Sequence, residues 1–94
     1  MNQTLEESLF QRKQTGFLLS PDKFLAEMLK KLWSPEVLEF RVFDKGVQAI
    51  ELMFTDPPDL LVVDNRLSDI SGREVANLVK SENVYRQLPV VMCV

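Results

Sequence analysis

The segment that decides the fold of this chain reads Pro58-Asp59-Leu60-Leu61-Val62-Val63-Asp64-Asn65. An apolar run of this length, bounded by turn-forming residues, is typical of a strand buried on both faces of a parallel sheet. Ligands of open parallel sheets bind beyond the carboxyl ends of the strands. Asp64, which ends the run, is therefore the first candidate functional residue, and a plain turn or cap acid is the alternative.

Apolar and amphipathic segments alternate along the rest of the chain. We predict further strands at 16–19, 37–43 and 88–94, and helices at 21–33, 44–54 and 71–81. This alternation predicts a parallel α/β sheet with right-handed crossovers.

Three residues suit the starts of the first two helices. Ser20 and Asp44 are the expected caps, and Pro21 suits the first helical position. Residues 1–15 form a lead-in that is either a short helix or a frayed terminus, and residues 16–94 form one domain.

Composition narrows the class of protein. The 94 residues suit a single domain, and the net charge of -3 argues against a nucleic-acid partner for this segment. With no histidine and one cysteine, histidine chemistry, an internal disulfide and a multi-cysteine metal site are all excluded. No apolar run reaches the length of about 18 residues that predicts a membrane span.

Taken together, the segments resemble the receiver domain of two-component response regulators over about residues 16–94. The resemblance rests on the Asp64 strand, on the helix start Gly46-Val47-Gln48-Ala49-Ile50, on Leu67, Gly72 and Glu74 after the acid, and on Leu88-Pro89-Val90-Val91-Met92. It implies a flavodoxin-like parallel sheet with strand order 2-1-3-4 and three crossover helices, beside the N-terminal helix if that forms.

The resemblance implies a role in signalling rather than an enzyme. Asp64 would be the phosphoacceptor that takes a phosphoryl group from a partner histidine kinase and so controls a downstream output domain. Magnesium would assist, held by Asp64, by the backbone carbonyl of Arg66 and by acids after the first strand. Of those acids only Asp22 is near, and we expect it to cap the helix rather than bind the metal. The implied location is the cytoplasm.

The chain departs from the receiver pattern in three places. The acidic pair should fall near Ser20 and Pro21, neither of which is acidic, and Ser68 stands where a proline is usual. Val94 lies where the switch hydroxyl belongs, and the fifth strand with its lysine and the last two helices are absent. We therefore expect a piece of a longer protein, with a naturally short partial receiver as the alternative, and an uncovered sheet face that the lead-in or a second copy of the chain covers.

Two other functions compete with phosphoacceptance. A degenerate pseudo-receiver would keep the fold as a protein-binding or dimerisation module without phosphorylation. An unrelated nucleotide-binding enzyme is disfavoured, because the three glycines are isolated and form no phosphate-binding loop.

Overall fold

A computed structural model describes residues 13–82 and 87–93, and within them the chain forms one parallel sheet flanked by helices. The strands are β1 (Gln14–Leu19), β2 (Leu38–Phe43), β3 (Leu60–Asp64) and β4 (Val90–Cys93), and the helices are α2 (Lys23–Leu32), α3 (Gly46–Met53) and α4 (Gly72–Ser81). The strand order is β2-β1-β3-β4 with every neighbouring pair parallel. The predicted alternation and strand order are confirmed, although β1 begins two residues before the predicted start.

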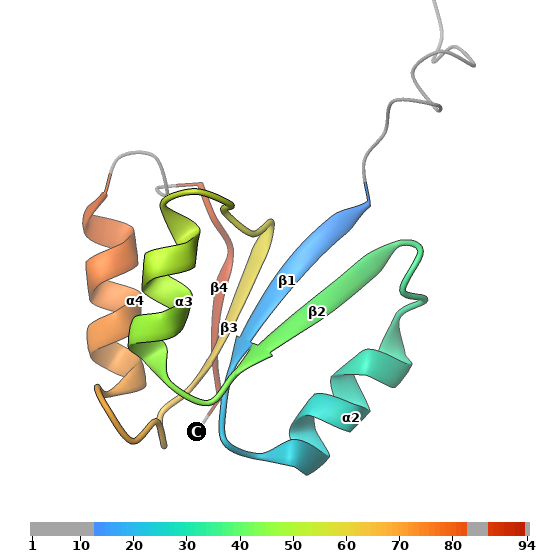
Figure 1. The fold of residues 1–94 in the computed structure, drawn as a ribbon, viewed down its shortest axis with the longest axis horizontal. Helices are drawn as coiled ribbons and strands as arrows, with labels where there is room; N and C mark the ends of the chain where they lie inside the picture. The colour runs from blue at the N-terminus through green and yellow to red at the C-terminus, as the bar shows by residue number, and fades with distance from the viewer. Residues whose placement is uncertain (1–12, 83–86, 94) are drawn as a thin grey trace, which may run out of the picture.

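The helices cover the two faces of the sheet unequally. Helices α3 and α4 lie side by side on one face, whereas α2 lies alone on the other (Figure 1). All three helices begin beside the carboxyl ends of strands, so their N-termini and the connecting loops gather at one edge of the sheet. The predicted lead-in helix lies in residues 1–12, outside the described residues, as does Val94.

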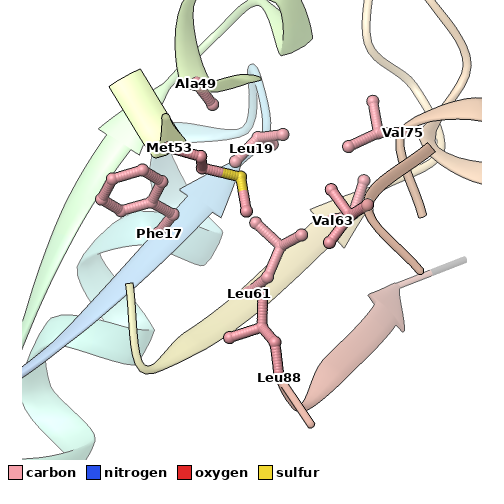
Figure 2. Close-up of a cluster of buried hydrophobic side chains, with 9 residues drawn as sticks. Phe17, Leu19, Ala49, Met53, Leu61, Val63, Val75 and Leu88 are labelled. Atoms are coloured by element: carbon pink, nitrogen blue, oxygen red, sulfur yellow. The ribbon is translucent and has the colours of Figure 1, made fainter. Parts of the chain in front are cut away.

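The larger core forms between the sheet and the α3–α4 layer. Figure 2 shows side chains of β1 and β3 meeting Met53 and Ala49 of α3 and Val75 of α4, with the Met53 thioether directed at the strands. The strand side chains in this cluster are Phe17, Leu19, Leu61 and Val63, all fully buried. Because successive strand residues point to opposite faces, the intervening Leu18 and Val62 face α2 instead.

The smaller core lies beneath α2. Ala26 of this helix packs with Leu18, Phe40 and Val62, while Leu25 and Leu29 complete the contact. Burial of β1 and β3 on both faces explains their continuous apolar sequences. It also holds β3 in place, so that its last residue, Asp64, lies at the carboxyl edge of the sheet.

Candidate functional site

Asp64 lies at the carboxyl end of β3 with only 1% of its surface exposed. Its Oδ1 accepts hydrogen bonds from the backbone N–H of Arg66 at 2.9 Å and from Arg66 Nε at 3.0 Å. Its Oδ2 accepts from Ser20 Oγ at 2.7 Å and from Arg66 Nη2 at 2.7 Å. The carboxylate is thus buried with four donors directed at its two oxygens.

These contacts keep Asp64 ionised. The hydrogen bonds from the Arg66 side chain lower the pKa of Asp64 from 3.8 to about 2, helped by Ser20 and opposed by burial. In return, Asp64 and Asp22 raise the pKa of Arg66. A buried carboxylate paired in this way is an anion held in one orientation, and the cation that pairs with it, Arg66, comes from the loop that follows β3.

Asp22 approaches the same guanidinium from the start of α2. Arg66 Nη2 donates to Asp22 Oδ2 at 3.3 Å. The other oxygen, Oδ1, accepts from the backbone N–H groups of Phe24 and Leu25, which makes Asp22 the N-cap of α2. The hydrogen bond from Leu25 is the main reason that the pKa of Asp22 is lowered. The expected capping role of Asp22 is confirmed.

Two other capping predictions are wrong. Ser20 does not cap α2: its hydroxyl accepts from the backbone N–H of Asp22 at 3.0 Å and donates to Asp64. Pro21 accordingly precedes the cap instead of opening the helix. Asp44 does not cap α3, because the N-cap residue is Lys45, whose side chain makes no cap hydrogen bond.

The cap of α3 comes from Asp69, in the loop after Asp64. Asp69 accepts from the backbone N–H groups of Gly46 and Val47, each at 2.9 Å. The bonds from Val47 and then Gly46 lower the pKa of Asp69 to about 2. This contact ties the loop that follows the site to the N-terminus of the neighbouring helix, and no local sequence signal indicated it.

Gly72 holds α4 against the end of β3. A Cβ atom on this residue would stand 2.8 Å from the backbone oxygen of Asp64 and 2.9 Å from Val63 Cγ1. Helix α4 begins at this glycine behind a capping box formed by Ser71 and Glu74. The absence of a side chain therefore lets the helix approach the backbone of the site.

A divalent cation fits this arrangement poorly. Carboxylate and carbonyl oxygens are suitable ligands for magnesium, and Asp22, Asp64 and the Arg66 carbonyl supply the expected types. However, the Arg66 guanidinium contacts both carboxylates. Over residues 13–82 and 87–93, no group of three or more His, Cys, Asp or Glu side chains is placed to hold a metal ion.

Comparison with known proteins identifies the fold. No family model matches the chain. A response regulator from Chloroflexus aurantiacus superimposes with a TM-score of 0.77 at 26% identity, covering 85% of this chain and 66% of the other. The phosphorylated cyanobacterial phytochrome response regulator RcpA gives 0.75 at 24%, covering 85% and 64%. The Mn²⁺-bound form of response regulator Rcp1 gives 0.74 at 19%, covering 84% and 63%.

Curated relatives agree with the structural neighbours. The polar-differentiation response regulator DivK of Brucella abortus is 35% identical over 46 residues, which are 49% of this chain and 37% of DivK. The sensor histidine kinase TmoS of Ectopseudomonas mendocina is 34% identical over 47 residues, or 50% of this chain and 5% of TmoS. The matched segments are thus under two fifths of either relative.

The fold and the acidic site define an open parallel α/β domain with its candidate site at the carboxyl ends of the strands. More narrowly, the chain has the receiver-domain fold of two-component response regulators from its first strand through its fourth, which confirms the resemblance and the fold class. Within the described residues, no helix is both long enough and apolar enough to cross a membrane.

Proposed function

We propose that this chain is the signal-input domain of a response regulator and that Asp64 accepts a phosphoryl group from the phosphohistidine of a partner kinase. The observation that carries the proposal is a buried, ionised carboxylate at the carboxyl end of a central strand, with an arginine folded onto it. Carboxylates are competent nucleophiles toward phosphorus.

The transfer would proceed by displacement. An oxygen of Asp64 attacks the phosphorus, an O–P bond forms as the P–N bond breaks, and the electron pair stays on the departing imidazole nitrogen, which is then protonated by solvent. For this oxygen to attack, the Arg66 guanidinium must leave it. The Arg66 side chain is 66% exposed, so it has room to move.

The residues that now hold Asp64 would serve the phosphorylated form as well. A guanidinium binds phosphate oxygens through two parallel hydrogen bonds. The Ser20 hydroxyl and the backbone N–H of Arg66, already directed at Asp64, offer two further donors. Loss of the Asp64–Arg66 pair on phosphorylation would change the loop after β3, which Asp69 connects to α3.

Intact mass spectrometry after incubation with acetyl phosphate tests the proposal. The wild-type chain is expected to gain one phosphoryl group, and Asp64→Asn is expected to gain none. Asp44→Asn is the matched control, because Asp44 is exposed beside the same edge of the sheet. A wild-type chain that gains no phosphoryl group from either acetyl phosphate or a phosphorylated kinase would refute the proposal.

A second candidate function is a phosphorylation-independent binding module. The observation in its favour is the occupation of both Asp64 oxygens by Arg66 and Ser20, which leaves the carboxylate internally satisfied. Binding of a partner that is equal for wild type and Asp64→Asn, together with no mass gain, would favour this function.

The wider signalling context belongs to the same proposal. The likeness to response regulators and to a sensor kinase supports a histidine kinase as donor and an output domain as target. The Mn²⁺-bound neighbour raises a divalent cation as a cofactor, but the Arg66 guanidinium contacts both carboxylates that would bind it, so the proposed transfer does not depend on one. A cytoplasmic location and a homodimer complete the proposal.

A further inference from the structure

We infer that Arg66 is the resident cation of this site and takes the place that a divalent metal ion would need. The inference rests on the proposed function for its choice of site, but it concerns a different property. The unphosphorylated chain does not bind Mg²⁺ or Mn²⁺ at Asp64, because the Arg66 side chain already occupies the carboxylate.

The oxygens of Asp64 are already occupied by hydrogen-bond donors. A carboxylate offers about four lone-pair directions on its two oxygens. All four have a donor here: Arg66 N and Nε on Oδ1, and Ser20 Oγ and Arg66 Nη2 on Oδ2. A metal ion would have to displace at least one charged hydrogen bond before it gained its first ligand.

The second carboxylate is held in a similar way. Asp22 binds two backbone N–H groups of α2 through Oδ1 and the guanidinium through Oδ2. Moving Asp22 toward a metal would uncap the helix, and leaving it in place keeps it paired with Arg66. Neither acid is therefore available while the arginine remains.

The net charge of the cluster also disfavours a cation. The two carboxylates and the guanidinium sum to one negative charge, whereas two carboxylates alone would present two negative charges to a cation. The residues after β1 that could add charge, Ser20 and Pro21, are neutral. A divalent ion approaching this cluster meets a positive group at the oxygens it requires, so the arginine both blocks and repels it.

Direct metal titration tests the inference without any phosphodonor. Free Mn²⁺ is measured by its electron paramagnetic resonance signal as the wild-type chain and Arg66→Gln are titrated up to about 10 mM metal. Wild type is expected to show no binding of Mn²⁺ at the site up to about 10 mM, whereas Arg66→Gln is expected to bind with a dissociation constant at least about tenfold below that limit. Arg73→Gln, an equal charge change on exposed α4, is expected to match wild type.

Two further measurements place the effect. The double variant Arg66→Gln with Asp64→Asn should lose the gained affinity, which assigns it to Asp64. In the wild-type chain, Mn²⁺ should not broaden the amide NMR signals of Ser20, Asp22 and Asn65; this arm needs no variant and stands even if Arg66→Gln fails to fold. Selective broadening of these amides in wild type, or no gain of binding in a folded Arg66→Gln, would overturn the inference.

The outcome is independent of phosphorylation. A wild-type chain that binds no metal but gains a phosphoryl group supports both statements, and one that binds no metal and gains none refutes only the proposed phosphotransfer. A chain that binds Mn²⁺ at Asp64 and gains a phosphoryl group supports the phosphotransfer and refutes the role of Arg66.

Discussion

The Ser20 hydroxyl donates a 2.7 Å hydrogen bond to Asp64 Oδ2, across 44 positions of sequence and between two buried side chains. The pair joins the ends of adjacent parallel strands, because Leu19 of β1 is in register with Val63 of β3. Ser20 thus contributes a neutral donor at a position where the resemblance to receiver domains leads one to expect an acid.

Ser20→Ala removes this donor and leaves a buried oxygen with one partner fewer. We expect the free energy of unfolding to fall by about 1.5–3 kcal/mol, the range for hydrogen bonds to charged groups. Urea denaturation followed by circular dichroism measures the change. Ser68→Ala, in the exposed loop after Asp64, is the control and should leave the unfolding midpoint in place.

The low pKa of Asp64 predicts how stability depends on pH. Its folded value of about 2 lies below the ordinary 3.8, so the folded state favours the ionised form more than the unfolded state does. This contribution, about 2 kcal/mol, is complete above about pH 5 and is lost as the pH falls through about 2.

Denaturant titrations between pH 6 and about pH 2 test this dependence. The difference in free energy of unfolding between wild type and Asp64→Asn should shrink toward the acid end. A difference that stays constant across this range would show that Asp64 titrates normally in the folded chain.

The N-terminus of α3 is capped by Asp69 in the structure, whereas the sequence predicted Asp44. Asp69→Ala is expected to destabilise the fold, because the backbone N–H groups of Gly46 and Val47 lose their acceptor. Asp69→Asn should do so less, since its amide retains one acceptor oxygen. Asp44→Ala should have little effect. Thermal unfolding of the three variants checks the order, and a larger loss for Asp44→Ala would restore the sequence-based assignment.

Gly72→Ala tests the close approach of α4 to the site. The new methyl group would stand 2.8 Å from the Asp64 backbone oxygen, so the helix must shift. Overpacking of this kind costs about 1–3 kcal/mol. Gly46→Ala is the comparison, because its methyl group would meet only side-chain atoms at 3.0 to 3.3 Å, which can give way more easily. An equal loss for both would argue against a special role of Gly72.

Apolar side chains are exposed on α2 and on β4, and they could take part in self-association. Phe24 and Leu32 of that helix are 76% and 62% exposed, and Val91 of β4 is 48% exposed. Exposed apolar patches are common at protein interfaces. If two chains pair through this face, Phe24→Glu should lower the dimer fraction in sedimentation velocity, whereas Val47→Glu on α3 should not. A wild-type chain that sediments as a monomer at all concentrations would refute the homodimer.

Much of the fold follows from the sequence, because buried strands and amphipathic helices have local signatures. The apolar run before Asp64 predicts both a strand and the position of its acid, and the helix repeats predict which face each helix buries. The site is harder. The pairing of Arg66 with an acid two residues earlier has a local signal in the spacing of the charges. The hydrogen bond from Ser20 to Asp64 and the cap from Asp69 have none, because they join residues 44 and 23 positions apart.

Asp44 illustrates the limit. An aspartate just after a strand and before a helix is a normal cap by composition, and the structure uses Asp69 instead. The choice depends on where the loop after β3 passes, which only the assembled sheet determines.

Side-chain hydrogen bonds join β1 and β3 at both ends of their pairing. At the start of β3, Asp59 accepts from the backbone N–H of Thr15 at 2.8 Å and its own N–H donates to the Thr15 carbonyl at 2.7 Å. At the other end stands the Ser20–Asp64 hydrogen bond. A shift of the strand register by one residue would break the hydrogen bonds at both ends at once, so we expect β1 and β3 to open together rather than separately. Their amides are therefore expected to be the slowest in the chain to exchange with deuterium, and to exchange together.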